Sequence, residues 1–485
     1  MALISLIGVL VLLGLTWLIS YDKKAIPIRI IFWGIGLQFV FALIILRQDI
    51  WSFVGMFILT ALITAYILKD KNFINPKLFI APILLGFCYI NNYTGQVIFQ
   101  NFSDRVAYFL SLSDYGALFL FGNLADGAHF FTGPDSSWPG FGFQFAFKVL
   151  PTILFFGGFM SILYYFGIMQ KVINAMGKFM RWTVGTSGAE SLSCSANIFV
   201  GQTEAPLLIK PFIKEMTISE LTTIMVGGFA TIAGGVLAGY IAMGIPAGHL
   251  VAASVMSAPA ALVIGKIIYP EKEKSATAGD VSLPDIDVGS NAIEAASNGI
   301  TDGLKLAVNV GAMLIGFIAL IAVIDVILNW FDSIIDGLLF SGEYIKYKTS
   351  GMSPVSGEFI GYFPGSLQTF FGVLLKPLAF LMGVPWDNAH YVGNLLGIKL
   401  SLNEFVAYGT LGSYISEGVL TERGMIISTY ALCGFANFSS IGIQLGGISA
   451  LAPERKSDLA KIGLRAMFGG AVASWLTATI AGILL

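Results

Sequence analysis

The chain has 485 residues, and Lys, Arg, Asp and Glu make up 12% of them, about half of the roughly 25% typical of soluble domains. Hydrophobic residues make up 56%, and the mean hydropathy is +0.80. Such a composition cannot supply the polar surface that a soluble protein needs. The net charge of −2 gives no basic footprint for nucleic acid. We therefore expect a polytopic membrane protein that binds no nucleic acid.

Ten apolar segments are long enough to cross a lipid bilayer as helices, because about 20 residues span its hydrocarbon core of roughly 30 Å. The first of them has no basic residue before it and no small-residue cleavage site after it. We expect it to stay as a membrane helix, unlike a secretory signal. The ten predicted spans are 2–20, 28–46, 51–68, 78–94, 147–168, 220–242, 247–268, 306–330, 425–449 and 466–485.

Two further segments, 188–213 and 389–418, are apolar in parts but interrupted by polar residues. We expect each to be a re-entrant hairpin that enters and leaves the membrane on the same side. Ten crossings then place both termini on one side. With the termini outside, 19 of the 27 Lys and Arg residues fall on the inner side, as the positive-inside rule requires. The prediction is a multi-pass protein of the cell (inner) membrane with both termini outside.

A polar cytoplasmic linker at 271–300 divides the chain into two halves. Before the first half, we expect membrane helices and then an interfacial helix with an outer loop. The predicted organisation is N-terminal helices at 1–95, the interfacial segment at 96–146, a first repeat at 147–270 with its hairpin at 188–213 and a broken helix at 220–242, and a second repeat at 301–485 with its hairpin at 389–418 and a broken helix at 425–449.

The two halves carry matching interruptions in a membrane span. The sequence Gly-Phe-Ala-Thr at 228–231 interrupts one span, and Gly-Phe-Ala-Asn at 434–437 interrupts the other. Unwound backbone in lipid costs several kcal/mol per unpaired polar group, so it persists only where it lines a cavity or binds a ligand. Paired interruptions of this kind indicate a secondary transporter built from inverted repeats, with its site at their interface.

Each predicted hairpin also contains a carboxylate, Glu204 in the first and Glu404 in the second. An ionised side chain among apolar residues in a membrane costs at least about 2.5 kcal/mol, so such residues are functional by default. The alternative is a structural salt bridge, for which Lys210 and Lys399 are the nearest basic residues in sequence. Glycines such as Gly228 could instead serve only close helix packing.

A membrane-embedded enzyme and a channel are the competing classes. Buried Glu and Asn can act as acids and bases, but the sequence has no H-E-x-x-H and no Walker A motif. Its three Cys are odd in number and widely spaced, which suggests neither a disulfide framework nor a zinc site. A channel would more typically show one pore-lining pattern. We expect a transporter that is not an enzyme and has no organic cofactor.

Three long motifs resemble those of the concentrative nucleoside transporter family, and the resemblance covers roughly residues 100–485. They are ANIFVGQTEAPL at 196–207, NEFVAY at 403–408 and CGFANFSSI at 433–441, in this order. The resemblance implies an all-α polytopic membrane protein with inverted repeats, two re-entrant helical hairpins and two broken transmembrane helices. It also implies a homotrimer, each protomer having a scaffold and a moving transport domain, that imports nucleosides such as uridine and adenosine by sodium symport through elevator-type alternating access.

By this resemblance, eight residues bind the nucleoside. Three would meet the base, three would hold the ribose hydroxyls and two would give apolar contacts. A carboxylate suits a ribose because it can accept two vicinal hydroxyl donors through charge-assisted bonds. In that order, the residues are Gln202, Thr203 and Glu204, then Glu404, Asn437 and Ser440, then Phe435 and Val236.

The family's sodium site falls on four residues of this chain, and backbone carbonyls of the broken segments would add ligands. Sodium is a hard cation that prefers oxygen ligands, which amide, hydroxyl and carbonyl groups provide. Proton coupling is the alternative, carried by a hairpin carboxylate because none of the three His lies in the motifs. The sodium residues would be Asn197, Val200, Thr231 and Ile232.

One departure from the family pattern is an additional apolar pair within 51–94, around the basic residues Lys69, Lys71 and Lys77. An even insertion preserves the topology of everything that follows it. The pair therefore leaves the expected transport core unchanged, and its role stays open, as do base preference and stoichiometry.

Overall fold

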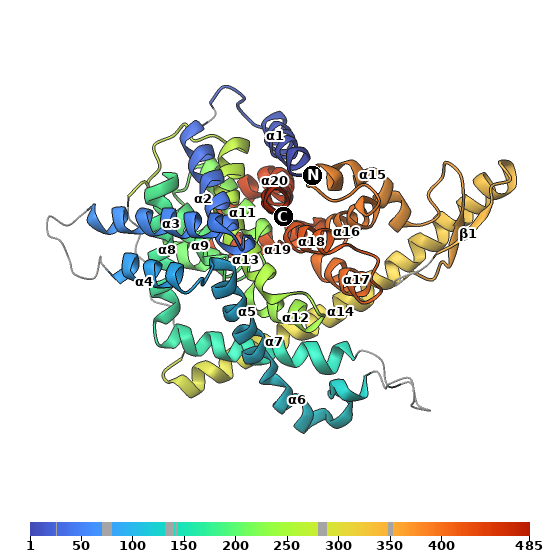
Figure 1. The fold of residues 1–485 in the computed structure, drawn as a ribbon, viewed down its shortest axis with the longest axis horizontal. Coiled ribbons are helices and arrows are strands. Elements are labelled where there is room, and N and C mark those ends of the chain that lie inside the picture. Colours follow the sequence, from blue (N-terminus) through green and yellow to red (C-terminus); the bar gives the residue numbers. More distant parts are fainter. Residues whose placement is uncertain (26, 70–79, 131–139, 141–143, 280–288, 348–352) are drawn as a thin grey trace.

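The computed structural model describes residues 1–25, 27–69, 80–130, 140, 144–279, 289–347 and 353–485. Within these ranges the chain is almost entirely helical (Figure 1). The helices are α1 (Ala2–Leu18), α2 (Ile28–Leu46), α3 (Ile50–Leu68), α4 (Ile80–Ile90), α5 (Gly95–Ser111), α6 (Ser113–Phe121), α7 (Phe145–Tyr165), α8 (Ile168–Val184), α9 (Gly188–Ala196), α10 (Lys210–Ile213), α11 (Ile218–Ala230), α12 (Gly234–Ala242), α13 (Ala247–Ile268), α14 (Ala292–Asp332), α15 (Leu367–Leu381), α16 (Ala389–Ser401), α17 (Glu404–Ser416), α18 (Glu422–Leu432), α19 (Phe438–Leu451) and α20 (Lys456–Leu484).

Short elements complete the fold. A π-helix, Ser333–Leu339, extends α14. Beyond it, β1 (Tyr344–Lys346) pairs antiparallel with β2 (Gly357–Phe359), with Tyr344 opposite Phe359. The 3-10 helices are Gly122–Leu124, Gly127–His129, Ala205–Ile209 and Pro453–Arg455.

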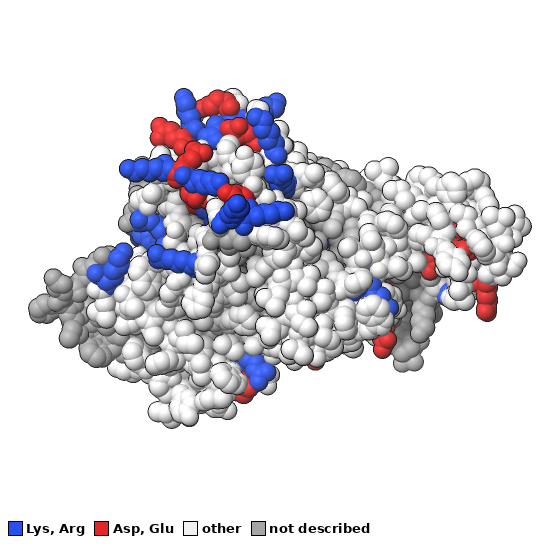
Figure 2. Space-filling model, turned by 90° about the horizontal axis from the view of Figure 1, so that it is seen from above, with Lys and Arg blue, Asp and Glu red and all other residues white. Residues whose placement is uncertain are grey.

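Seven helical segments in the described ranges are long and apolar enough to cross a membrane. Three of the ten predicted spans are not among these seven. The first is the 17-residue α1, the fourth starts at residues 78 and 79 outside the described ranges and contains the 11-residue α4, and the ninth is divided between α18 and α19. Charged side chains gather at one end of the face in Figure 2, above a broad uncharged surface. The all-α polytopic membrane fold is confirmed.

The spans differ in how deeply they lie in the molecule. More than four-fifths of the apolar window is buried in Ile218–Ala242, in α13 and in the segment that ends with α20. Only 11% is buried in Ile318–Leu339, which joins the last part of the 41-residue α14 to the π-helix that follows it. This helix packs along α7 and continues to the β1 end of the molecule (Figure 1). Its outer apolar side chains suit lipid or another subunit rather than water.

The segments predicted as hairpins each contain two short helical parts. Hairpin 1, residues 188–213, contains α9, a 3-10 turn and α10. Hairpin 2, residues 389–418, contains α16 and α17, separated by Leu402 and Asn403. The Asn403 side chain accepts from the Val406 amide at 2.9 Å and so caps α17. Entry and exit on one side of the membrane stays a prediction for both hairpins.

Both predicted helix interruptions exist, at slightly different positions from those expected. The first helix continues through Ala230 and resumes at Gly234, so Gly228 is helical. A Cβ added at Gly228 would lie 2.6 Å from Gln444 Nε2, which makes close packing the reason for this glycine. The second break covers 433–437 and includes Gly434, whose φ is +133°.

The two breaks touch each other. A Cβ added at Gly434 would lie only 2.5 Å from the carbonyl oxygen of Phe229, in the last turn of α11. The positive φ and this close approach both require glycine at the position. The two half-helices therefore meet backbone to backbone.

Two boundaries differ from the sequence-based expectation. The linker predicted at 271–300 ends early, because α14 begins at Ala292. The Asn291 side chain accepts from the amides of Ile293 and Glu294, which fixes this start. The single interfacial helix expected at 96–146 is two helices, α5 and α6, and α7 begins inside that segment.

Charged residues tie the start of hairpin 1 to the loops beside it. The buried Lys266 ammonium lies 2.6 Å from Glu190 and 3.2 Å from Glu271. Lys272 pairs with Asp22, and this hydrogen bond lowers the pKa of the Asp22 carboxyl below its usual value. The contacts hold α9, α13 and the loop after α1 together at one end of the bundle.

Candidate functional site

A cavity of about 490 Å³ lies between the two hairpins, the two broken helices and α14. The structure brings all eight sequence-predicted substrate residues to its wall, although they come from four separate parts of the chain. They are Gln202, Thr203, Glu204, Val236, Glu404, Phe435, Asn437 and Ser440.

Glu404 is the buried carboxylate of this cavity, with only 4% of its surface exposed. Its Oε1 accepts from the Tyr240 hydroxyl and its Oε2 from Asn437 Nδ2, both at 3.2 Å. Glu404 is also the first residue of α17, where the helix dipole favours negative charge. Groups from both broken helices and from hairpin 2 therefore hold one carboxylate.

Asn437 both caps a helix and donates a hydrogen bond to Glu404. Its Oδ1 accepts from the Ser440 amide at 2.9 Å and so caps α19, and it also accepts from the Ser439 hydroxyl at 2.7 Å. Its Nδ2 donates to Glu404. Because Oδ1 is engaged by the helix, the amide group is oriented with its donor toward the carboxylate.

The hairpin 1 side of the cavity is arranged differently. Gln202 Oε1 accepts from Gln444 Nε2 at 3.0 Å, which joins hairpin 1 to α19. The carboxylate of Glu204 accepts from the Gly201 amide at 2.6 Å, and its side chain is exposed. This side offers amide and carboxylate groups on a short turn, without a buried charge.

Sequence reasoning missed several lining residues. Asn309 and Leu306 come from α14, and Phe405 and Ser439 stand beside motif residues that were chosen. Asn309 was detectable as an amide near the start of a largely apolar span. No local sequence pattern indicated Tyr240, which lies 164 residues before Glu404.

The four predicted sodium residues are all buried. The Oδ1 and Nδ2 atoms of Asn197 have no hydrogen-bond partner in the described structure. Thr231 donates to the Gly227 carbonyl at 2.9 Å, and a Cβ added at Gly227 would lie 3.4 Å from Asn197 Nδ2. Asn197 and Thr231 therefore adjoin the same turn of α11. An unpaired, buried amide oxygen is a group that a hard cation would satisfy.

Across the described ranges, no cluster of three or more His, Cys, Asp or Glu residues could hold a metal ion. A cation near Asn197 would therefore depend on neutral oxygen ligands.

A second cavity of about 350 Å³ adjoins the first and is bounded by hairpin 1, α7, α12 and α14. Glu204, Ala233 and Leu306 line both cavities. Tyr164 and Asp302 line only this one. Glu204 thus lies at the junction between the central cavity and a second space.

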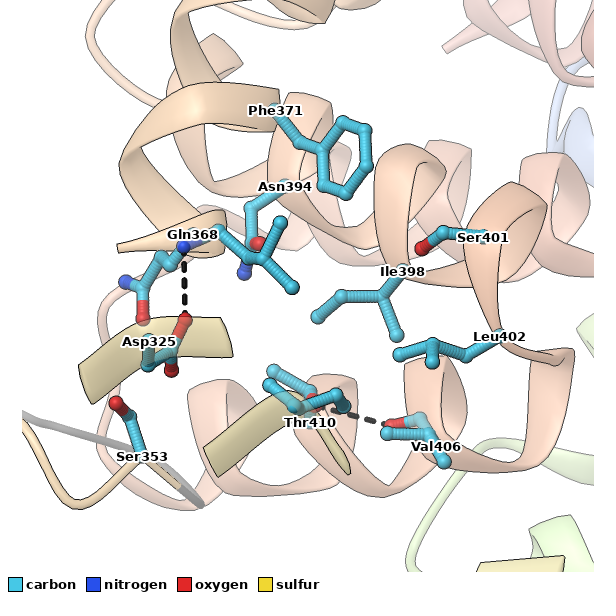
Figure 3. Close-up of a pocket in the computed structure, with 12 residues that line it drawn as sticks. Asp325, Ser353, Gln368, Phe371, Asn394, Ile398, Ser401, Leu402, Val406 and Thr410 are labelled. Atoms are coloured by element: carbon cyan, nitrogen blue, oxygen red, sulfur yellow. Dashed lines mark hydrogen bonds between the residues drawn. The ribbon is translucent and has the colours of Figure 1, made fainter. Parts of the chain in front are cut away.

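A third, much smaller cavity of about 40 Å³ lies between α14, α15 and hairpin 2 (Figure 3). Its wall includes Asp325, which is 2% exposed and accepts from the Leu367 amide at 2.8 Å. Because Leu367 is the first residue of α15, this carboxylate holds that helix start against α14. The cavity has room for water but not for a nucleoside.

Three family profiles match the chain in order. They are the Na⁺ dependent nucleoside transporter N-terminus at 7–65, nucleoside recognition (Gate) at 146–247, and the Na⁺ dependent nucleoside transporter C-terminus at 249–482.

Relatives match over nearly the whole chain. An uncharacterized transporter of Haemophilus influenzae is 40% identical over 99% of this chain and 97% of its own length. Sodium/nucleoside cotransporter 1 and sodium/nucleoside cotransporter 2 of Mus musculus are 38% and 37% identical, each over 99% of this chain. The chain spans 64% and 62% of the lengths of these two mouse proteins.

Solved structures of the transporter CNTnw have the same fold. In an inward-facing substrate-bound state, CNTnw is 36% identical with a TM-score of 0.77, over 100% of this chain and 98% of that one. A doubly substituted CNTnw in an outward-facing state is 35% identical with a TM-score of 0.76, over 100% and 97%. The chain therefore belongs to the concentrative, Na⁺-dependent nucleoside transporter family.

Proposed function

We propose that this protein imports nucleosides by symport with sodium across the inner membrane. One observation carries the proposal: eight residues from two hairpins and two broken helices line a single cavity of about 490 Å³. The names of its relatives, which include sodium/nucleoside cotransporters, give the substrate class and the coupling ion.

Ribose recognition would centre on Glu404. A carboxylate has about four acceptor positions, and Tyr240 and Asn437 use two of them at 3.2 Å. The remaining positions can accept the vicinal hydroxyls of a ribose. Ser440 and Phe435 stand beside them, and on the opposite wall Gln202 and Thr203 offer donors and acceptors to a base.

Sodium would be cargo held by Asn197 and Thr231, with carbonyl oxygens near Val200 and Ile232. The unpartnered amide of Asn197 supports this position, because an oxygen left unpaired in the interior is costly until an ion binds it. Proton coupling is the second candidate, since Glu404 is a buried carboxyl group on the wall of the central cavity.

Alternating access would be of the elevator type, with hairpins and broken helices moving as one body against α7 and α14. The second cavity, which shares Glu204 with the first, would serve as a route from the site toward one side. The exposed apolar face of α14 supports assembly into a homotrimer. Both termini would lie outside.

Uptake of radiolabelled uridine and adenosine into proteoliposomes tests this function. We expect accumulation above the external concentration with an inward sodium gradient and none with an equal potassium gradient. Accumulation driven by a proton gradient without sodium would establish the second candidate instead. Purely downhill uptake, or no uptake, would refute symport.

Two further measurements test the assembly and the orientation. Native mass spectrometry in detergent should give three copies per particle, and a monomer would contradict the trimer. A cysteine added at either terminus should react with an impermeant thiol reagent from outside the cell, and protection would contradict the orientation.

A further inference from the structure

Lys399 of α16 is a fully buried lysine, with 0% of its surface exposed. Its ammonium donates to the carbonyl oxygen of Ala431 at 2.9 Å. No carboxylate of the described ranges lies within 4.0 Å of it. Burying an ammonium without compensation costs several kcal/mol. The position must therefore supply a compensating negative potential.

Two features supply it. Ala431 lies in the last turn of α18, where helix carbonyls lack intrahelical partners and carry partial negative charge. The second feature is the carboxylate of Glu404, which begins α17 only five residues after Lys399 in the last turn of α16. Lys399 therefore contacts the end of a half-helix and belongs to the same hairpin tip as the buried carboxylate of the central cavity.

The other groups around Glu404 are neutral. Tyr240 and Asn437 donate to its two oxygens, Tyr408 donates instead to the Thr429 carbonyl, and the Cys433 thiol is buried nearby. Lys399, in the last turn of α16, is the basic residue nearest to Glu404 in the sequence, and it is fully buried. Burial disfavours the ionised form of a carboxyl group, and a nearby cation favours it.

The distance between the two charges matters as much as their signs. Elsewhere in this protein, Lys266 and Glu190 form a direct buried pair at 2.6 Å, in which the ammonium occupies a carboxylate oxygen. Lys399 forms no direct ion pair with Glu404. Both carboxylate oxygens therefore remain available to Tyr240, to Asn437 and to a ligand in the cavity. Its neighbours Ile398, Ser401 and Leu402 line the separate small cavity of Figure 3.

We propose that Lys399 is a positioning residue for nucleoside binding. It keeps Glu404 ionised from a distance, so that the carboxylate oxygens stay free to accept ribose hydroxyls. The part that concerns ribose rests on the proposed function. The electrostatic coupling of Lys399 and Glu404 does not.

A double-mutant cycle tests the coupling without any nucleoside. Lys399→Met, Glu404→Gln and the double variant are compared by thermal unfolding in detergent. Each single change leaves one charge buried without its partner, so each should lower Tm. The double variant should be more stable than additivity allows, by about 3 °C or more. Additive losses would overturn the proposal.

The ribose role is tested by competition between uridine and 3′-deoxyuridine. The preference for uridine should fall about fivefold or more in Lys399→Met, because a neutral carboxyl group has fewer acceptor positions. Lys399→Arg keeps the charge and should retain the preference. The matched control is Lys376→Met. Lys376 is a partly exposed lysine of the adjacent α15 whose ammonium lies over the Trp386 ring, and its substitution should leave the preference unchanged.

An unchanged preference in Lys399→Met would also overturn the proposal. If the protein binds no nucleoside at all, the proposed function fails, and the unfolding cycle still decides whether the two charges are coupled.

Discussion

Hairpin 1 and hairpin 2 each bring one glutamate to the central cavity, but the two carboxylates have opposite surroundings. Glu204 is exposed, accepts from a backbone amide of its own turn and borders two cavities. Glu404 is 4% exposed and accepts from two side chains of other elements, and the buried Lys399 lies in the same hairpin. The two glutamates occupy matching hairpins of the internal repeat, but the free-energy cost of keeping the side chain ionised is much higher for Glu404 than for Glu204.

The difference follows from what packs against each hairpin. The Glu404 hairpin lies against α15 and α18 and receives Tyr240 from α12, so water is excluded and every polar group needs a partner. The turn that carries Glu204 borders the central cavity on one side and the second cavity on the other. We therefore expect the second repeat to determine nucleoside affinity and the first to adjust it.

The largest effect should come from breaking the joint between the two repeats. Gly434→Ala would place a Cβ 2.5 Å from the Phe229 carbonyl oxygen at a φ of +133°, which backbone and neighbour cannot both accommodate. We expect little folded protein by size-exclusion chromatography. Gly442→Ala, on α19 with open space around its Cβ position, is the control and should fold normally. Normal yield of the first variant would show that the contact is dispensable.

The second-largest effect should come from the loss of the buried carboxylate of Glu404. Glu404→Gln keeps the volume but removes the charge that strengthens two bonds to ribose, so uridine affinity should fall by about 3 kcal/mol, on the order of a hundredfold. Isothermal titration of the purified variant measures this loss. Unaltered uridine affinity would contradict the assignment of Glu404.

The ion position gives a smaller and more specific effect. Asn197→Ala removes one of the proposed oxygen ligands, so half-maximal uridine uptake should need about tenfold more sodium, or roughly 1.4 kcal/mol. Thr231→Ala should act in the same direction. Asn394→Ala in hairpin 2 is a matched control, because this amide is also buried and its Oδ1 is also unpartnered. Equal sodium dependence of the Asn197 and Asn394 variants would argue against the site.

The smallest effect should come from the exposed carboxylate. Glu204→Gln loses a charge that water already solvates, so uridine affinity should fall by less than about tenfold, equivalent to one ordinary hydrogen bond. The same titration series as for Glu404→Gln gives a direct comparison. A loss as large as that of Glu404→Gln would remove the distinction between the hairpins.

The sequence predicted the residues that line the cavity better than the residues that hold them in position. Glu204, Glu404 and the two interruptions were detectable because polar groups and glycines are rare and costly in apolar spans. The role of Gly228 in helix packing, rather than in the break itself, depends on Gln444 and could not be read locally. The donor Tyr240 also depends on long-range packing.

Burial was the property that the sequence predicted least well. Glu204 and Glu404 are similar in local composition, and only the packed elements around them distinguish an exposed charge from a buried one. Helix ends such as Ala292 were misplaced for a related reason, since the polar sequence before a span continues into the long helix α14. Whether a polar residue starts a helix or precedes it depends on caps such as Asn291.

The contact between Gly434 and Phe229 has a thermodynamic consequence. It joins the end of α11, beside Asn197 and Thr231, to the break that presents Asn437 to Glu404. If sodium binds at the first break and a nucleoside at the second, as proposed, the ordering of one break would restrict the other through this backbone contact. Reciprocity then requires each ligand to strengthen the binding of the other by the same factor.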